Sequence, residues 1–155
     1  MRPDNDNSID QFVEKFVPST LDGIVRKNRD LCELRLSTEK EIKGLSAISV
    51  AIQRGGAVTG VLNQWRFVCI NRNELLGGQS HVVTGIEEAR NTVWSTSEIV
   101  SADMSSGVVQ TKSGSVYQLG IKGDGEPDID ILIHICVQIH RWGFGKLLGV
   151  PEFFY

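Results

Sequence analysis

The apolar stretch from Pro127 to Trp142 constrains the fold more than any other part of this chain. Its sequence, PDIDILIHICVQIHRW, places isoleucine or valine at every second position from 129 to 139, which is typical of a strand. Its polar residues follow another period: they are spaced by four, four and three, which aligns them in one stripe along a helix. A strand would scatter them over both of its faces. These residues are Asp130, His134, Gln138 and Arg141.

The two ends of this stretch favour the helix. Pro127 suits the first helical position, and the carboxylates of Asp128 and Asp130 suit the positive end of a helix dipole. Arg141 suits the negative end, just before Gly143. A strand of this length would also be unusual. We therefore predict a helix that is buried on nearly all sides, with a long strand as the alternative.

Length and composition indicate one soluble globular domain. The 155 residues are 41% hydrophobic and 23% charged, and at this size a core forms without disulfides or metals. We expect residues 1–7 to be a flexible lead-in and 8–155 to form a single domain. The net charge of -3 disfavours a nucleic-acid partner, and the absence of a long apolar run disfavours a membrane partner.

Cysteine usage and the polar start of the chain both indicate the cytoplasm. The first ten residues, MRPDNDNSID, lack the basic and apolar regions of a signal peptide. The three cysteines are odd in number and widely spaced, and each lies in an apolar or alternating run. We therefore predict buried, reduced thiols. They are Cys32, Cys69 and Cys136.

The N-terminal third has helical spacing. Ser8 begins a capping box and an amphipathic helix that Pro18 ends, and the apolar Leu21, Ile24 and Val25 predict a second short helix after Ser19. The run LCELRL at 31–36 predicts a short strand. A second capping box then predicts a helix on the apolar positions 42, 45, 48 and 52, which glycines 55 and 56 end.

The middle of the chain is rich in strand residues. The run WRFVCIN at 65–71 predicts a buried strand, followed by a turn at Gly77 and Gly78. Residues 93–102, 108–112 and 115–119 predict a three-stranded meander. The predicted fold class is therefore α+β: N-terminal helices, a mostly antiparallel central sheet with this meander, and a buried C-terminal helix.

No arrangement of residues predicts catalysis, a metal site or a cofactor. Cys136 and His140 are four apart and would share one side of a helix, but a zinc site needs two more ligands and no second pair is recognisable. A catalytic thiol would also need solvent in an electropositive setting, whereas this helix is apolar. The glycines of GGAVTG at 55–60 lack the spacing of a phosphate-binding loop.

Aromatic residues carry the remaining functional signals. The tail VPEFFY puts three aromatics at a chain end, where something must cover them: their own domain, a second protomer or another protein. The first hypothesis is a small cytosolic, non-enzymatic protein-interaction or regulatory module that self-associates through this tail or binds an unknown protein. Its interaction residues are Phe153, Phe154, Tyr155 and Trp142.

Two alternatives stay open. One is a small-ligand or nucleotide-binding domain, in which tryptophan stacks on a ring and arginine supplies charge. The other is an enzyme that depends on Cys136 and His140. The residues of the ligand-binding alternative are Trp65, Arg66, Trp94 and Arg141.

Overall fold

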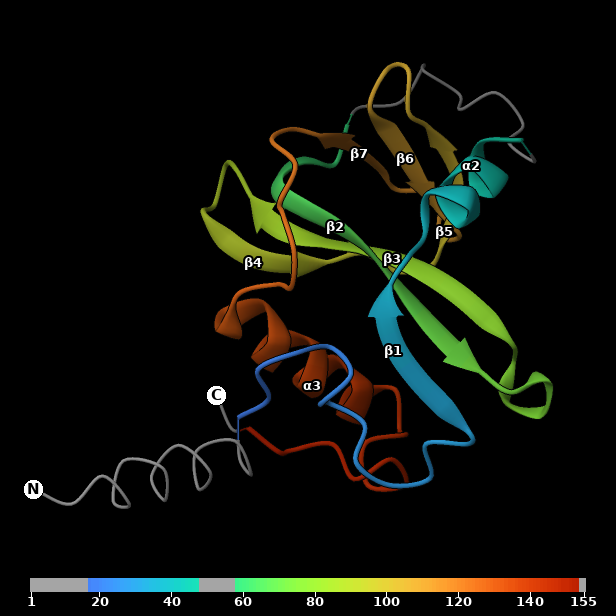
Figure 1. The fold of residues 1–155 in the computed structure, drawn as a ribbon. Helices are drawn as coiled ribbons and strands as arrows, with labels where there is room; N and C mark the ends of the chain where they lie inside the picture. Colours follow the sequence, from blue (N-terminus) through green and yellow to red (C-terminus); the bar gives the residue numbers. More distant parts are fainter. Residues whose placement is uncertain (1–16, 48–57, 154–155) are drawn as a thin grey trace, which may run out of the picture.

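The computed structural model describes residues 17–47 and 58–153. This part of the chain forms a mixed sheet of seven strands with two α-helices, which is the α+β class that the sequence predicts (Figure 1). The elements are β1 (Cys32–Leu36), α2 (Glu39–Ala47), β2 (Gly60–Arg72), the 3-10 helix η1 (Glu74–Leu76), β3 (Gln79–Glu87), β4 (Thr92–Ser95), β5 (Ile99–Asp103), β6 (Val108–Thr111), β7 (Val116–Leu119) and α3 (Ile129–Arg141).

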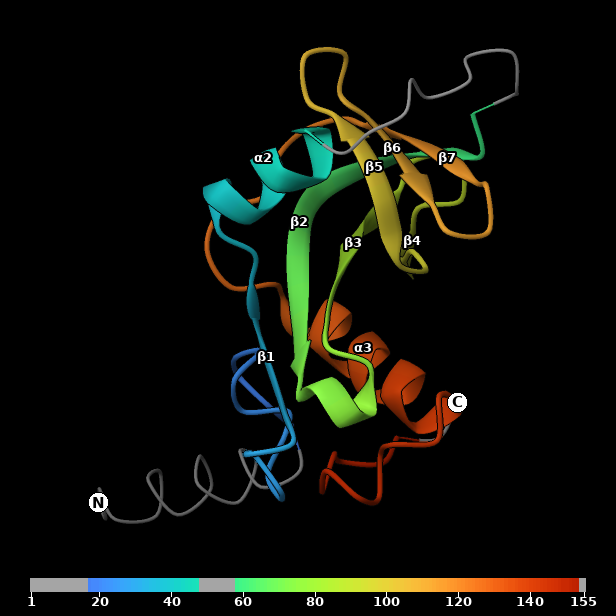
Figure 2. The same ribbon diagram turned by 90° about the vertical axis from the view of Figure 1, so that its right-hand side faces the viewer.

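The long strand β2 organises the sheet. One of its edges pairs antiparallel with β3, while the other edge pairs parallel with β7 at its start and antiparallel with β1 at its end. The order is β4-β3-β2-β7-β6-β5, with β1 beside β2. A bulge lies between Asn63 and Arg66, where Gln64 has a φ of 52°, and β2 bends along its length (Figure 2).

The two faces of β1, β2 and β3 meet different partners. The helices α2 and α3 lie on opposite sides of these strands (Figures 1 and 2). Alternate residues point to opposite faces of a strand, so Leu34, Val68 and Val82 join the core under α3, whereas Phe67 and Val83 join the core under β5–β7. The sheet thus separates two apolar cores, and each face can carry its own site.

The predicted C-terminal helix is confirmed, but its burial on nearly all sides is wrong. The side of α3 that faces the sheet is buried, whereas Ile129 is 51% exposed, and Ile133 and Val137 are half-buried. The sheet covers only one side of this helix. The other members of the period-two pattern, Ile129, Ile133 and Val137, lie on sides of the helix that the sheet does not cover. The buried residues are Ile131, Leu132, Ile135, Cys136 and Ile139.

The predicted second N-terminal helix is wrong. Leu21, Ile24 and Val25 are buried, but the segment consists of turns and bends. Its backbone groups bond to distant parts of the chain: the Leu21 N–H donates to Glu126 Oε2 at 3.0 Å, and two further N–H groups donate to the Leu148 carbonyl. These bonds replace those of a helix. The predicted lead-in at 1–7 and the helix from Ser8 lie outside the described residues.

The predicted helix after Ser37 is confirmed at its start. The Glu41 N–H donates to Thr38 Oγ1 at 3.1 Å, and the Thr38 N–H donates to Glu41 Oε1 at 2.8 Å, which completes the capping box. Ile42 and Leu45 pack against the core under β5–β7. Positions 48 and 52 and the two glycines at 55 and 56 lie outside the described residues.

The strand predictions hold in part. Residues 32–36 of the predicted strand 31–36 form β1, and the run 65–71 lies in β2. Gly77 and Gly78 turn the chain with φ of 111° and 72°, and β5, β6 and β7 form an antiparallel meander. The predicted single strand 93–102 is wrong, because it is divided into β4, which pairs with β3, and β5, which pairs with β6. The strand is interrupted at Thr96, whose backbone N–H donates to the Val83 carbonyl of β3 and whose Oγ1 accepts from the Val83 N–H.

Candidate functional site

An apolar pocket lies between the end of α3 and the sheet face that α3 covers. Its volume is about 200 Å³, and we call it the Trp142 pocket. Among the apolar lining residues, the sheet contributes Leu34 and Ile70, and the hairpin end contributes Leu76. The end of α3 and the loop that follows it contribute the other apolar residues. Its apolar lining is Leu34, Ile70, Leu76, Ile139, Trp142, Phe144 and Leu148.

A few polar groups line one side of this pocket. Arg72 donates from Nε to the Gly78 carbonyl at 3.1 Å and from Nη2 to Ser80 Oγ at 3.0 Å, so it fastens the β2–β3 turn. Burial raises the pKa of the Cys32 thiol, which therefore stays protonated at neutral pH. Glu98 and Ser97 line the same side. The pocket is thus mainly apolar, with one cation and one carboxylate in its wall.

The predicted interaction residues fall in two places. Trp142 ends α3, lines the pocket and is 42% exposed. Phe153 is half-buried and packs against the core under α3, so this part of the tail lies on its own domain. Phe154 and Tyr155 lie outside the described residues. Trp142 borders the Trp142 pocket, whereas Phe153 borders a separate cavity of about 340 Å³ that also includes Val137 and His140 in its lining.

A larger groove brings together two of the four residues of the ligand-binding alternative. It lies between α2 and the connector at 122–125, has a volume of about 490 Å³, and includes Trp65, Arg66, Lys43 and Lys122 in its lining. We call it the Trp65 groove. The other two residues lie elsewhere: Trp94 is on β4 and donates to the Tyr117 hydroxyl at 3.1 Å, and Arg141 is exposed on α3.

Much of the polar capacity of the Trp65 groove is already used within the chain. Arg66 is 8% exposed and donates to the carbonyls of Gln64, Asp124 and Gly125, which holds the connector against β2. The ammonium of Lys122 lies 5.9 Å from the Trp65 ring centre. These partners are backbone carbonyls, so none of them neutralises the positive charge of Arg66.

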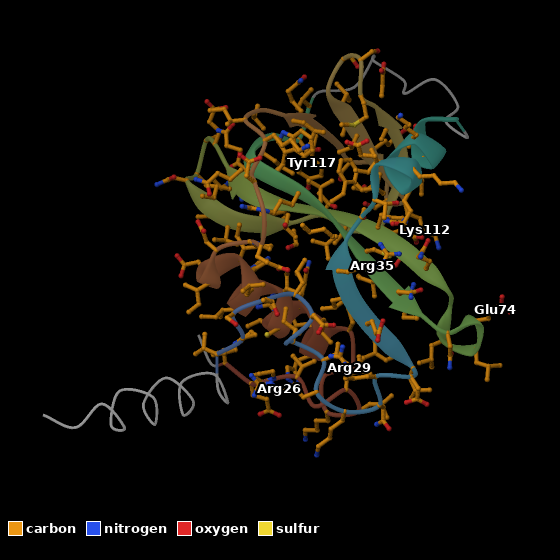
Figure 3. The ribbon with its side chains drawn as sticks, viewed as in Figure 1. Arg26, Arg29, Arg35, Glu74, Lys112 and Tyr117 are labelled. Atoms are coloured by element: carbon orange, nitrogen blue, oxygen red, sulfur yellow. The ribbon has the colours of Figure 1, made fainter. Side chains whose placement is uncertain are left out.

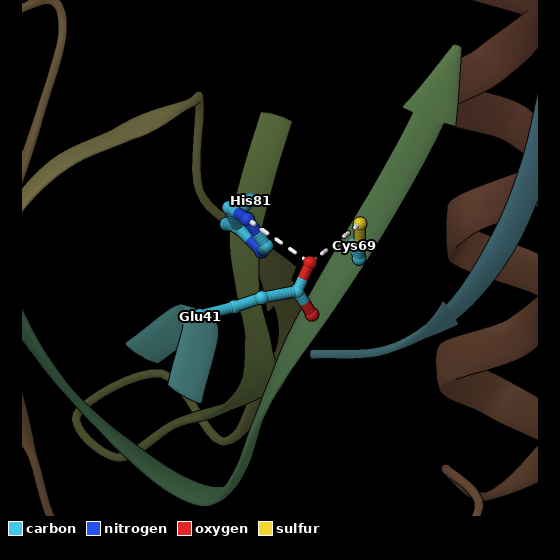
Figure 4. A group of neighbouring side chains, drawn as sticks. All are labelled: Glu41, Cys69 and His81. Atoms are coloured by element: carbon cyan, nitrogen blue, oxygen red, sulfur yellow. Dashed lines mark hydrogen bonds and ion pairs between the residues drawn. The ribbon is translucent and has the colours of Figure 1, made fainter. Parts of the chain in front are cut away.

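A polar cluster lies beneath α2, on the sheet face opposite the Trp142 pocket. Strand register places Arg35 of β1, Cys69 of β2 and His81 of β3 in one row, and the first turn of α2 brings Glu41 over it. Arg35, labelled in Figure 3, donates to both Glu41 oxygens at 2.7 and 2.9 Å. The carboxylate reaches between the other two side chains, and its Oε2 lies 4.0 Å from Cys69 Sγ and 4.0 Å from His81 Nε2 (Figure 4). Ser37 Oγ lies 2.7 Å from His81 Nδ1.

These contacts set the charges of the cluster. The hydrogen bonds from Arg35 lower the pKa of Glu41 to about 2, so the carboxylate is ionised. Burial lowers the pKa of His81, which favours the neutral imidazole. Burial raises the pKa of Cys69 to about 11, so the thiol is protonated. At neutral pH the cluster is therefore an arginine–glutamate ion pair beside a neutral histidine and a thiol.

Sequence reasoning missed this cluster. The sequence predicts Cys69 only as a buried, reduced thiol, and it predicts the capping box that contains Glu41 only as the start of a helix. The usable signal is the hairpin, but its register must be known: residue 69 pairs with residue 81 about a centre at Leu75, whereas counting outward from the Gly77–Gly78 turn would pair residue 69 with residue 86. The capping box then fixes Glu41 at the end of β1.

The predicted Cys136 and His140 pair does not form a reactive couple in the structure. Cys136 is fully buried and burial raises its pKa to about 12, so its thiol is neither ionised nor accessible. His140 Nε2 instead lies 2.8 Å from the Val150 carbonyl oxygen, where it ties the C-terminal segment to α3. All three cysteines are free and buried, as predicted.

Comparisons with models of protein families, with curated proteins and with solved structures found no match to this chain. Neither of the described helices, α2 and α3, is long and apolar enough to cross a membrane. Among the described residues, the candidate sites are therefore the Trp142 pocket, the Trp65 groove and the polar cluster.

Proposed function

We propose that this chain is a cytosolic, non-enzymatic protein-interaction module whose Trp142 pocket holds one apolar side chain of a protein partner. The observation that carries the proposal is an apolar cavity bordered by a half-exposed tryptophan, Trp142. The three buried, reduced thiols support the cytosol as its compartment.

The size of the pocket favours a single side chain over a small metabolite. Sites for drug-sized ligands enclose roughly 300–1,000 Å³, whereas an apolar cavity of about 150 Å³ already accepts benzene. The Trp142 pocket, at about 200 Å³, therefore fits one aromatic ring or one branched aliphatic group. Protein interfaces commonly rest on such an anchor, which enters a well-packed pocket and excludes water.

The surface around the pocket suits such an interface. Leu75 is 95% exposed on η1, next to Leu76 in the pocket lining, and Trp142, also in the lining, is 42% exposed. Tryptophan is enriched among residues that dominate binding energy. Covering an exposed leucine of this kind contributes roughly 1.5–3 kcal/mol by apolar transfer, so partner binding has a favourable term beyond the pocket itself.

Selection from a phage-displayed random peptide library tests the proposal without knowledge of the partner. We expect enriched peptides to share one aromatic or branched aliphatic position, and Trp142→Ala to weaken their binding at least tenfold. The matched control is Trp94→Ala, because Trp94 is 38% exposed but does not line the pocket. Fluorescence anisotropy of labelled peptides measures both affinities.

A second pair of variants fills the pocket instead of opening it. Ser97 is exposed and lines the pocket, so Ser97→Trp should occupy it and abolish peptide binding. Ser113 is also exposed but does not line the pocket, and its Oγ lies 3.4 Å from Ser97 Oγ. Ser113→Trp should therefore leave peptide binding unchanged. Peptides that bind both pairs of variants equally, or a library that yields no enrichment, would refute the proposal.

A specific observation supports a second function, the binding of a small anion. The Trp65 groove has a volume of about 490 Å³ and three cations in its lining, Lys43, Arg66 and Lys122, against the carboxylates of Glu39 and Asp124. Nucleotides raise the melting temperature if they bind only the folded protein. We expect Lys43→Ala to reduce any such shift and Lys112→Ala, outside the groove, to leave it unchanged.

Self-association through the tail remains a prediction. The packing of Phe153 on the core under α3 supports docking of the tail on its own domain. Deletion of residues 151–155 should therefore lower stability independently of protein concentration, and light scattering should show an unchanged mass. A change from dimer to stable monomer would instead place the tail in an interface.

A further inference from the structure

Three potential metal ligands from separate elements converge on the sheet face opposite the Trp142 pocket. Glu41 comes from α2, Cys69 from β2 and His81 from β3, and one ligand atom of each lies within 4.8 Å of the others (Figure 4). Cys69 is fully buried and His81 is 8% exposed. Carboxylate, thiolate and imidazole together are a donor set that suits zinc, whereas calcium and magnesium prefer oxygen alone.

We propose that Glu41, Cys69 and His81 form a binding site for one zinc-class divalent ion, with a fourth position left for water. Binding replaces the Cys69 S–H bond by a metal–thiolate bond, and the proton passes to solvent. Glu41 contributes one oxygen and His81 contributes the lone pair of Nε2. The two anionic ligands balance the charge of the dication. This inference concerns the other face of the sheet and does not depend on the interaction proposed for the Trp142 pocket.

The separations fit a small contraction around an ion. Zinc–ligand bonds of about 2.0–2.3 Å at tetrahedral angles place neighbouring ligand atoms about 3.3–3.6 Å apart. In the structure Glu41 Oε2 lies 4.0 Å from both Cys69 Sγ and His81 Nε2. A carboxylate movement of about half an ångström closes most of this difference, which rotation within the Glu41 side chain can supply. The ligand atoms of Cys69 and His81, which lie within 4.8 Å of each other, must also approach by movement of those two side chains.

Outer hydrogen bonds already orient two of the ligands. Ser37 Oγ lies 2.7 Å from His81 Nδ1, and in the tautomer with the proton on Nδ1, the Nε2 lone pair faces Glu41 and Cys69. The Thr38 N–H and Arg35 Nη1 both donate to Glu41 Oε1, which leaves Oε2 on the side of the cluster. Metal-binding histidines and carboxylates are commonly held by such partners.

Arg35 competes with the metal ion for Glu41 Oε2. Its Nη2 donates to Glu41 Oε2 at 2.9 Å, and this bond must break before Oε2 can bind a metal. The Arg35 side chain is 39% exposed, so its guanidinium can turn toward water while Nη1 keeps its bond to Oε1. The ion pair explains how the cluster stays charge-balanced without metal, and Arg35→Gln should therefore tighten metal binding.

Cobalt(II) titration of the chelator-treated, reduced protein tests the site. Cobalt takes the tetrahedral positions of zinc, and a bound thiolate gives it a ligand-to-metal charge-transfer band. We expect one equivalent per chain to produce this band and one equivalent of zinc to remove it. Cys69→Ser should abolish the band, whereas Cys32→Ser and Cys136→Ser should keep it, although those two thiols are also buried.

Two further variants keep the test decisive if Cys69→Ser fails to fold, which circular dichroism reports. Glu41→Gln and His81→Gln should each weaken cobalt binding at least tenfold in isothermal titration calorimetry. Glu39→Gln, in the same first turn of α2 but outside the cluster, should leave affinity unchanged. A wild-type protein without a thiolate band, a band that survives in folded Cys69→Ser protein, or a cobalt affinity that Glu41→Gln and His81→Gln leave unchanged overturns the proposal.

Discussion

The ion pair between Arg35 and Glu41 gives a stability prediction that can be worked out from the structure. Glu41→Gln removes the carboxylate charge but keeps an amide oxygen for the Thr38 N–H, so the helix cap can persist. The substitution also turns an NH₂ group toward the Arg35 guanidinium, where no acceptor remains for one of its donors. We expect the metal-free variant to be less stable than the parent at pH 7.

The pKa shift of Glu41 sets the size of the expected loss in the free energy of unfolding. A carboxylate pKa lowered from 4.5 to about 2 in the folded state corresponds to at most about 3 kcal/mol, chiefly from the Arg35 hydrogen bonds. Solvent reaches this pair, because the side chains of Arg35 and Glu41 are 39% and 17% exposed. Screening therefore reduces the expected loss to about 1–2 kcal/mol.

The sign of the pH dependence follows from the same shift. Because the folded-state pKa is the lower one, the unfolded chain binds more protons as the pH falls below 4.5, and this stabilisation is lost toward pH 2. The difference in free energy of unfolding between the parent and Glu41→Gln should therefore be largest at pH 7, roughly half of that value at pH 3 and near zero at pH 2.

Urea unfolding with a chelator present, followed by circular dichroism at each pH, measures these differences. Glu39→Gln is the matched control, since Glu39 shares the first turn of α2 but is exposed. It should cost only the small interaction of a carboxylate with the helix dipole. A Glu41→Gln difference that stays constant from pH 7 to pH 3, or that equals the Glu39→Gln effect, would refute the reasoning.

Three other predictions concern packing. Ile135→Ala should cost about 2–5 kcal/mol in urea unfolding because Ile135 is 5% exposed, whereas Ile129→Ala at a 51% exposed position should cost well under half as much. Gly145→Ala should destabilise the fold, since a Cβ there collides with the His140 ring, whereas Gly44→Ala, where a Cβ meets nothing within 4 Å, should not. The three buried thiols should react with a thiol reagent only as fast as the chain opens, so rapid labelling of the native protein would contradict their burial.

Local patterns in the sequence were sufficient where one element decides its own structure. The polar stripe of α3 outweighed its alternating isoleucines, because a stripe of four polar residues has one natural solution on a helix. The capping box at Thr38 and Glu41 marked the start of α2, and both of its hydrogen bonds are formed. These features involve residues three or four apart, which is the range that helical periodicity reports.

The errors arise where distant segments decide the local structure. Leu21 and Ile24 have helical spacing, yet their segment satisfies its backbone groups through Glu126 and Leu148, more than 100 residues away in the chain. Thr96 lies in a continuous run of strand residues, yet its bonds to Val83 divide that run into two strands. None of these three partners lies in the neighbouring sequence, so periodicity alone could not find the turns.

The alternation of β1, β2 and β3 explains why both candidate sites were hard to read from the sequence. Along β2, Cys69 faces the polar cluster and Ile70 faces the Trp142 pocket, and along β1, Arg35 and Leu34 divide in the same way. A run that serves two partners shows neither a clean apolar alternation nor a continuous apolar pattern.

The same alternation allows the two sites to be tested separately. Cys69 and Ile70 are neighbours in the chain, but successive side chains of a strand point to opposite faces, so a substitution on one face leaves the contacts of the other in place. Coupling between sites requires an element with two arrangements that both ligands bias. β2 is held by β1, β3 and β7 along its length, and this rigidity argues against such an element between the cluster and the pocket. Metal-ligand variants such as His81→Gln should therefore retain peptide affinity, and Ser97→Trp should retain the cobalt band.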